Sequence, residues 1–119
     1  MRVLIVGASA KPERYAHMAM VELRSKGHEV VLFNPGLEEI EGIPVKNSFD
    51  QITEPIDTVS LYVGPEQLIP MIDQIISLKP KRIISNPGTE TSEMRNRAQE
   101  AGIEYIEACT LMMSKSEQF

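Results

Sequence analysis

Residues 3–9, Val-Leu-Ile-Val-Gly-Ala-Ser, run from an unbroken apolar stretch directly into a turn of small residues. A strand that is buried on both faces reads as a continuous aliphatic run, so residues 3–6 indicate the centre of a parallel sheet. In such sheets, ligands bind at the carboxyl ends of the strands, where backbone N–H groups and a helix N-terminus attract anions. The stretch therefore predicts an α/β fold whose first strand ends in a phosphate-binding loop.

The residue types of this loop suit a phosphate. Gly7 and Ala8 allow a ligand to approach the main chain closely, and Ser9 adds a hydroxyl group. Lys11 and Arg14 carry positive charges on side chains long enough to reach a phosphate oxygen. A tight strand-to-helix connection without a ligand is the alternative interpretation, because small residues are common in such turns.

Composition and charge bound the class of protein. The 119 residues, 42% of them hydrophobic, suffice for one domain with its own core. A net charge of -5 disfavours a general nucleic-acid binder, which needs clustered Lys and Arg. The single cysteine excludes an intrachain disulfide framework, and no apolar run approaches the roughly 20 residues of a membrane-spanning helix. Because the first residues enter a core strand rather than a signal peptide, we expect a cytoplasmic protein.

Apolar periodicity predicts strands that alternate with helices. Such alternation is typical of right-handed βαβ units, and hence of a three-layer, doubly wound parallel sheet of the Rossmann-like type. We expect this domain to span residues 1–113, and residues 114–119 to form a polar C-terminal tail that frays. The expected strands lie at 3–6, 29–33, 43–45 (a short edge strand), 58–63, 81–85 and 104–106, and the expected helices at 14–26, 67–78 and about 94–101, with a single helical turn and its capping box at 48–51.

Small residues and prolines end four of the predicted strands. Because the carboxyl ends of parallel strands meet at one edge of the sheet, these four loops would line one crevice wide enough for an extended ligand. Proline and glycine end strands in many proteins, so any one of the loops alone is weak support for binding. The four segments are Gly7-Ala8-Ser9, Asn34-Pro35-Gly36, Gly64-Pro65 and Asn86-Pro87-Gly88.

A nicotinamide cofactor is the first candidate for such a crevice, and two features disfavour it. Only Gly7 fits the dinucleotide fingerprint G-x-G-x-x-G, because Ser9 and Pro12 stand where the later glycines would be. An NAD site also uses a carboxylate at the end of the second strand to hold the ribose, and this chain has Asn34 there. With a neutral Asn34, and with Lys11 and Arg14 near the first turn, the pocket suits a nucleotide that carries an extra ribose phosphate better than NAD.

Several motifs, taken in order over nearly the whole chain, resemble the small single-domain CoA-binding protein family, which is similar to the CoA-binding domain of the succinyl-CoA synthetase α-subunit. The resemblance implies a Rossmann-like sheet that binds coenzyme A, with the diphosphate at the first loop and the adenine near the second. The motifs are Val6-Gly7-Ala8-Ser9 with Pro12 and Arg14, then Phe33-Asn34-Pro35, Asn86-Pro87-Gly88-Thr89-Glu90, Gly102-Ile103 and Ala108-Cys109-Thr110-Leu111.

The resemblance also implies which residues contact the coenzyme. One departure concerns the loop after the third parallel strand, which is basic or polar in many relatives and here reads Tyr62-Val63-Gly64-Pro65. The implied phosphate-side contacts are Gly7, Ala8, Ser9, Lys11, Pro12 and Arg14, the residues beside the nucleoside are Asn34 and Pro35, the pocket lining is Val63, Gly64 and Pro65, and the far wall near the pantetheine arm is Asn86, Pro87 and Gly88.

The resemblance implies binding rather than ligation. The synthetase needs a second domain with a phosphorylated histidine and a partner subunit, and this chain ends soon after its sheet closes. We therefore expect a non-catalytic module for CoA or an acyl-CoA, with a small molecule and neither nucleic acid nor membrane as its partner. The alternatives are an NAD(P)-binding redox enzyme or regulator, and an interaction domain with a vestigial pocket.

The remaining reactive side chains do not form a recognisable site. His17 has no carboxylate or second histidine near it in sequence, so we expect an ordinary surface or capping role, and we expect His28 to be exposed. Two histidines and one cysteine provide no metal-ligand spacing. We expect Cys109 to be a small buried residue, the alternative being a mixed disulfide with the thiol of the ligand. The acidic stretch 38–41 reads as a solvated loop.

Overall fold

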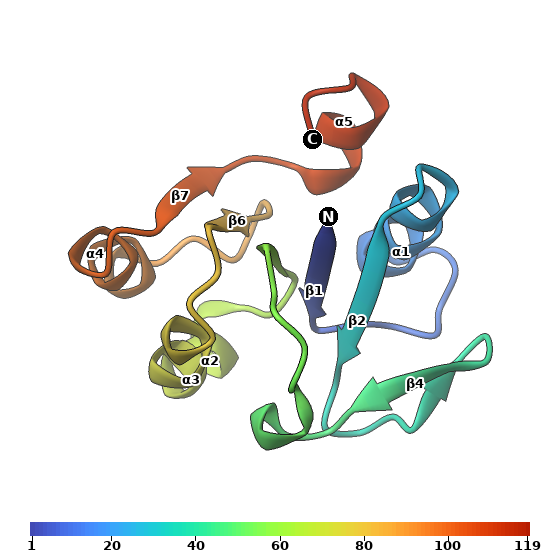
Figure 1. Ribbon diagram of the computed structural model, residues 1–119, viewed down its shortest axis with the longest axis horizontal. Helices are drawn as coiled ribbons and strands as arrows, with labels where there is room; N and C mark the ends of the chain where they lie inside the picture. The colour runs from blue at the N-terminus through green and yellow to red at the C-terminus, as the bar shows by residue number, and fades with distance from the viewer.

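A computed structural model that describes all 119 residues contains one seven-stranded sheet (Figure 1). The strand order is β3-β4-β2-β1-β5-β6-β7, and every neighbouring pair is parallel except β3 and β4. The predicted Rossmann-like α/β fold is thus confirmed. The strands are β1 (Arg2–Val6), β2 (Glu29–Phe33), β3 (Glu39–Ile40), β4 (Ile43–Lys46), β5 (Thr58–Leu61), β6 (Arg82–Ser85) and β7 (Glu104–Glu107).

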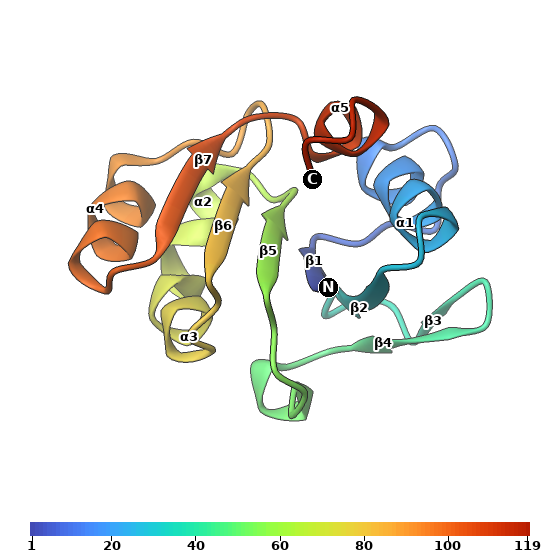
Figure 2. The same cartoon turned by 45° about the horizontal axis from the view of Figure 1, so that its top comes forward.

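The central strand β1 explains why the aliphatic run is unbroken. Alternate side chains of a strand point to opposite faces of the sheet. Leu4 and Val6 join the larger hydrophobic cluster with the helices α2 (Pro65–Leu68), α3 (Ile72–Ser77) and α4 (Ser92–Glu100). Val3 and Ile5 join the smaller cluster with α1 (Tyr15–Ser25). Figure 2 shows α1 and α5 (Thr110–Lys115) on one face of the sheet and α2, α3 and α4 on the other. The sheet is therefore the middle of three layers, and both of its faces are buried.

All the expected helices form, although one begins earlier and is divided, and the structure adds a C-terminal helix that was not expected. The expected helix 67–78 begins earlier, at Pro65, and Pro70 divides it into α2 (Pro65–Leu68), the 3-10 turn η2 (Ile69–Met71) and α3 (Ile72–Ser77). Proline is favoured in the first turn of a helix, where its missing N–H costs nothing, and interrupts a helix further along. The others are α1 (Tyr15–Ser25), η1 (Phe49–Gln51), α4 (Ser92–Glu100) and α5 (Thr110–Lys115).

Three local expectations about residues 38–51 are wrong. The strand at 43–46 is not at the edge, because β3 pairs with its outer side, and Ile40 in the supposed solvated loop is buried. The two-residue turn between β3 and β4 consists of Glu41 and Gly42, both with positive φ, as hairpin turns of this length require. Ser48 precedes η1 but its side chain caps no N–H, so the expected capping box does not form.

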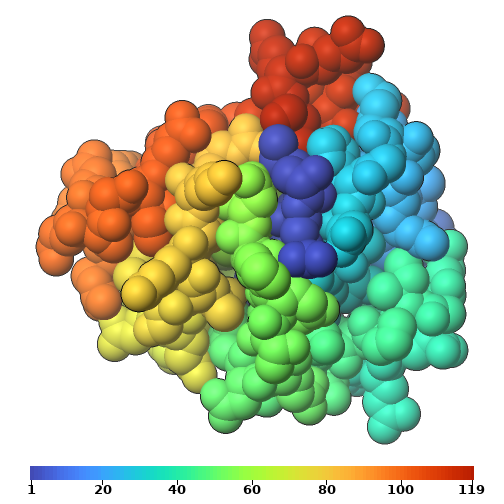
Figure 3. Space-filling view, viewed as in Figure 1, coloured from blue at the N-terminus to red at the C-terminus, as the bar shows by residue number.

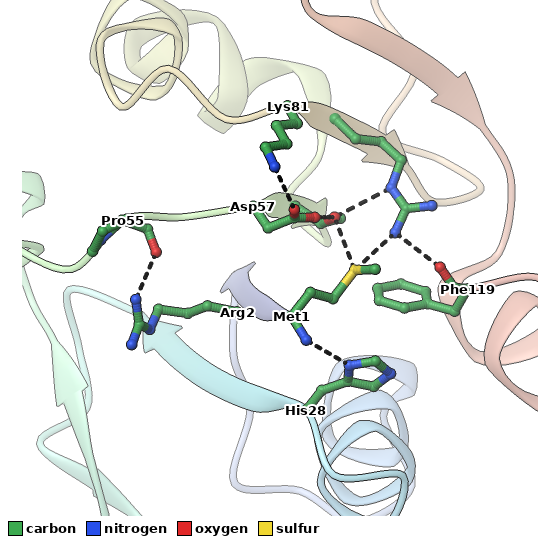
Figure 4. Close-up of polar contacts among 9 residues, drawn as sticks. Met1, Arg2, His28, Pro55, Asp57, Lys81 and Phe119 are labelled. Carbon is green, nitrogen blue, oxygen red and sulfur yellow. Dashed lines mark hydrogen bonds and ion pairs between the residues drawn. The ribbon is translucent and has the colours of Figure 1, made fainter.

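The C-terminal residues pack against the sheet instead of fraying. Ser114 belongs to α5 and is buried, so the expected tail does not begin there. The Phe119 ring lies 4.6 Å from the guanidinium of Arg82 and 5.3 Å from the ring of His28. Figure 4 shows Phe119, His28 and Met1 together at the amino ends of the strands, and the Met1 amino group lies 3.2 Å from His28 Nδ1. The contacts of Phe119 with Arg82 and His28 thus hold the polar C-terminal segment against the protein.

Figure 3 shows this end of the sheet as a continuous surface, with the first residues (dark blue) between the segments of β2 (cyan) and β5 (green). The amino ends of the strands are therefore filled by side chains. No helix of the structure is long and apolar enough to cross a membrane.

Candidate functional site

The carboxyl end of β1 is joined to the end of β2 by hydrogen bonds. The N–H groups of Gly7 and Ala8 donate to the carbonyl oxygen of Phe33 over 3.0 and 3.1 Å. The side chain of Asn34 completes the junction, because its Nδ2 donates to the Ala8 oxygen at 2.8 Å and its Oδ1 accepts from Gly36 N at 2.8 Å. Asn34 is thus a clamp between the first two loops, a structural role that sequence reasoning missed.

This junction moves the anion-binding groups further along the first loop. The resemblance put Gly7 and Ala8 among the phosphate-side contacts, but the Phe33 carbonyl engages the N–H groups of both. The N–H groups of Ser9 and Ala10 make no hydrogen bond, and neither do those of Tyr15 and Ala16 in the first turn of α1. Unpaired N–H groups of this kind are the ones that bind anions at a strand-to-helix turn.

Gly7 also allows the loop after β5 to approach the loop after β1 closely. Its φ is +94°, and a Cβ at this position would lie 2.9 Å from Val63 Cγ1 and 3.1 Å from the carbonyl group of Tyr62. The N–H of Tyr62 in turn donates to Val6 O at 2.8 Å. The loops after β1 and β5 therefore touch through the missing side chain of Gly7, which only glycine permits.

The loops after β1, β2, β5 and β6 border one cavity of about 910 Å³. This volume lies at the upper end of the range for small-molecule sites. The structure brings together nine of the residues expected there, namely Gly7, Ala8, Ser9, Lys11, Arg14, Asn34, Pro35, Val63 and Pro87. Gly36, which was expected only as part of the second strand-end loop, also lines it. Sequence reasoning missed nine others, namely Ala10, Tyr15, Ala16, Phe33, Leu37, Tyr62, Gln67, Met71 and Thr89.

Five expected residues, Pro12, Gly64, Pro65, Asn86 and Gly88, do not line the cavity. Gly64 and Pro65 form the N-cap and first residue of α2, so they belong to a helix rather than to an open loop. The Gly88 N–H donates to Glu90 Oε1 at 2.9 Å within its own turn.

Asn86 is buried and its side chain is fully occupied inside the protein. Its Nδ2 donates to Ser60 Oγ at 2.9 Å and to Leu61 O at 2.8 Å, and its Oδ1 accepts from Thr110 N at 2.8 Å. Ser60 Oγ and Thr110 Oγ1 lie 2.8 Å apart, which closes the network. Asn86 therefore ties β5 and the start of α5 to the end of β6 rather than facing a ligand.

Two positive side chains at the cavity have no carboxylate partner. Lys11 and Arg14 both line it, and neither takes part in the six ion pairs of the structure. Arg14 occupies the N-cap position of α1, and the first turn of that helix contains no acidic residue. The positive end of the helix dipole adds to the two charges. The arrangement favours binding of an anion at the N-terminus of α1.

His17 differs from its expected surface role. It is buried in α1, and its Nε2 contacts the carboxylate of Glu41 at the tip of the β3–β4 hairpin. The partner was not recognisable in sequence because Glu41 lies 24 positions away in a segment expected to be a loop. This pair holds the hairpin against the helix that carries the first loop.

Cys109 is half-buried at the N-cap of α5 and does not line the cavity. This position gives no support to a mixed disulfide with a bound ligand. No group of three or more His, Cys, Asp or Glu side chains is arranged to hold a metal ion.

Tyr62 contributes a buried phenol beside the cavity. Burial raises the pKa of Tyr62 to about 12, and its hydroxyl has no hydrogen-bond partner. The folded state thus favours the protonated phenol, so its contribution to stability is complete below pH 10 and is lost as the pH rises from 10 to 12. By linkage, the loss of unfolding free energy amounts to about 3 kcal/mol once the pH is above the pKa of Tyr62 in both the unfolded and the folded state.

We therefore expect alkaline unfolding to be shifted by removing this phenol. Urea unfolding of wild type and Tyr62→Phe at several pH values should show the wild type losing more stability between pH 10 and 12. Tyr15→Phe is the control, because Tyr15 is 65% exposed and its phenol is not buried in the folded state. Identical pH profiles for wild type and Tyr62→Phe would contradict the assignment.

Comparisons with known proteins find a matching family, a similar sequence and the same fold. The CoA binding domain family matches residues 1–115. Protein YneT of Bacillus subtilis (strain 168) is 27% identical over 101 residues, which cover 85% of this chain and 75% of that protein. A crystal structure of an uncharacterized protein superposes with a TM-score of 0.94 at 39% identity, covering 99% of this chain and 97% of the other.

The fold also occurs as part of much larger proteins. A Ca. Korarchaeum cryptofilum dinucleotide-forming acetyl-coenzyme A synthetase 1 superposes with a TM-score of 0.76 at 20% identity. The match covers 90% of this chain and 25% of the synthetase. At this identity the likeness shows a shared fold.

Proposed function

Because the chain belongs to the CoA-binding domain family, we propose that its cavity binds coenzyme A or an acyl-CoA. One observation carries the proposal: the cavity combines the unpaired N–H groups of Ser9, Ala10, Tyr15 and Ala16 with two positive side chains that have no acidic partner. Coenzyme A contains a diphosphate and a ribose phosphate, and these groups need such donors. The diphosphate then lies across the first loop and the start of α1.

The rest of the cavity suits the remainder of the ligand. Val63, Met71 and Pro87 line it beyond the first loop, and they offer apolar surface to the extended pantetheine arm. Gln67 and Thr89 border the same region and can exchange hydrogen bonds with its amides. In this arrangement the thiol or acyl end lies toward the loops after β5 and β6.

We further propose that the protein acts as a binding module without turnover. The titratable side chains that line the cavity are Lys11, Arg14, Tyr15 and Tyr62. A hydrolytic or transfer reaction uses a nucleophile and a base within hydrogen-bond reach of each other. The lining contains no carboxylate, histidine or cysteine, and the hydroxyl of Ser9 accepts a hydrogen bond from the backbone N–H of Lys11 at 3.1 Å rather than bonding to a side-chain base. The lining therefore supports binding of the coenzyme over chemistry on it.

A nicotinamide dinucleotide fits less well. The Asn34 amide, at the place where an NAD site has its ribose-binding carboxylate, is already bonded to Ala8 O and Gly36 N. No carboxylate lines the cavity to replace it.

Thermal shift measurements test the proposal. CoA, dephospho-CoA, NADP, NAD and ATP are compared, and CoA is expected to raise the melting temperature most. At 100 times its Kd, a ligand that binds only the native state stabilises it by about 2.7 kcal/mol. A larger shift with NADP would favour the redox alternative, and no shift with any ligand would favour an interaction domain with a vestigial pocket.

Arg14→Ala is expected to weaken CoA binding by about 1.5–3 kcal/mol, because it removes a charge-assisted hydrogen bond to a phosphate. Calorimetric titration measures the change in Kd. Arg24→Ala is the matched control, since Arg24 is exposed near the other end of the same helix and forms no ion pair. Equal affinity for Arg14→Ala and wild type would remove Arg14 from the site.

A further inference from the structure

Tyr15 is a large aromatic side chain that the free protein leaves in water. It is 65% exposed, the largest fraction among the large hydrophobic residues on the surface. It is also the first residue of α1 and lines the cavity together with its neighbour Arg14. An aromatic ring gains free energy when a second flat surface covers it, so this exposed ring is suited to a planar partner.

The other two aromatic residues of the cavity are already packed inside the protein and do not offer a free ring face to a ligand. Phe33 is only 3% exposed, and its ring stacks on Phe49 with 4.2 Å between the centroids. Tyr62 packs against the smaller hydrophobic cluster and its hydroxyl is buried. Tyr15 is therefore the aromatic surface that the cavity offers to a ligand.

The backbone of Tyr15 belongs to the group of donors that we expect to bind the phosphates. The N–H of Tyr15 is one of the unpaired groups at the start of α1, and Lys11 and Arg14 line the cavity with it. A nucleotide carries its base and its phosphates on one sugar, so a ring beside phosphate-binding groups lies where a base would be held. Pro35, which the sequence resemblance puts near the adenine, borders the same cavity.

We propose that the phenol ring of Tyr15 is the surface on which the nucleobase of the ligand stacks. This inference rests on the proposed function and adds to it the position of the adenine ring. Stacking on an aromatic side chain contributes through the face of the base, so the ring of Tyr15 is needed and its hydroxyl is not.

Three ligands separate the parts of the coenzyme: CoA, 3′,5′-ADP, which lacks the pantetheine arm, and 4′-phosphopantetheine, which lacks the base. Calorimetry measures each Kd for wild type, Tyr15→Ala, Tyr15→Phe and the control Tyr105→Phe. We expect Tyr15→Ala to bind CoA and 3′,5′-ADP about tenfold more weakly, and Tyr15→Phe to stay within about twofold of wild type. The affinity for 4′-phosphopantetheine should not change.

Fluorescence provides a second readout. The chain has three tyrosines and no tryptophan, so its intrinsic emission comes from tyrosine alone. Stacking should quench part of this emission in wild type and in Tyr105→Phe, and the quenching should disappear in Tyr15→Ala.

Two results would overturn the inference while leaving the proposed function intact: wild-type affinity of Tyr15→Ala for 3′,5′-ADP, or an equal loss for all three ligands, which would indicate a disturbed loop. Failure of the wild type to bind any of the three would refute the proposed function itself, and the inference with it.

Discussion

Gly7→Ala is expected to lower the free energy of unfolding by roughly 2–5 kcal/mol and to weaken CoA binding more than any change of a charged side chain. Two costs add. An alanine at φ +94° is strained by about 1–2 kcal/mol. Its Cβ would also lie 2.9 Å from Val63 Cγ1 and 3.1 Å from backbone atoms of Tyr62, and such overpacking costs about 1–3 kcal/mol more.

The expected loss of binding follows from the same contact. Val63 and Tyr62 both line the cavity, and the N–H of Gly7 holds the first loop to Phe33. A Cβ that pushes these loops apart displaces the unpaired N–H groups and the two positive side chains from their common wall. A small displacement of positioned groups is enough to reduce their combined effect strongly.

Gly88→Ala is the matched control for the strain term. Gly88 has the same φ of +94°, and a Cβ there would meet nothing within 4 Å. Urea unfolding should therefore show a loss of about 1–2 kcal/mol for Gly88→Ala and a clearly larger one for Gly7→Ala. Equal losses would mean that the contact with the third loop has no cost, and the close approach would then not explain why glycine stands at position 7.

The fold was readable from sequence because its core strands carry their own signal. The run at 3–6 and the segment 29–33 are apolar stretches that end at turn residues, and the structure places strands there with nearly the same bounds. The β3–β4 hairpin lacks such a run, since β3 has two residues and one of them is Glu39. Its signal was the Glu41-Gly42 turn between two isoleucines, which predicts a hairpin only when a second strand is already assumed.

The site was less readable because hydrogen bonding decides which loop residues are free. Sequence favoured the N–H groups of Gly7 and Ala8, and the Phe33 carbonyl takes both. Gln67 and Met71 were missed because they lie in the helical segment after the third loop, which begins at Pro65 rather than at 67, and only loop residues were expected to line the site. Proline in the first turn was the available signal for that boundary.

Asn86 is a residue that was expected at the site and that the structure instead uses for internal hydrogen bonds. The resemblance suggested a wall of the ligand pocket, and the structure buries the residue in a network that joins three elements. Asn86→Ala is expected to cost roughly 3–5 kcal/mol of stability, because it removes three hydrogen bonds and leaves the N–H of Thr110 and the oxygen of Leu61 buried without these partners. Chemical unfolding followed by circular dichroism measures the change.

The affinity of the folded variant distinguishes the two roles of Asn86. The side chain of Asn86 does not line the cavity. The hydroxyl of Thr89, which does, donates to the backbone oxygen of Asn86 at 2.8 Å, and this hydrogen bond remains possible in Asn86→Ala. CoA should then bind Asn86→Ala at low temperature with a Kd within about threefold of wild type, a change below 1 kcal/mol. Asn96→Ala, an exposed asparagine in α4, should alter stability by no more than about 0.5 kcal/mol. A variant at position 86 with normal stability and weakened binding would return this residue to the ligand site.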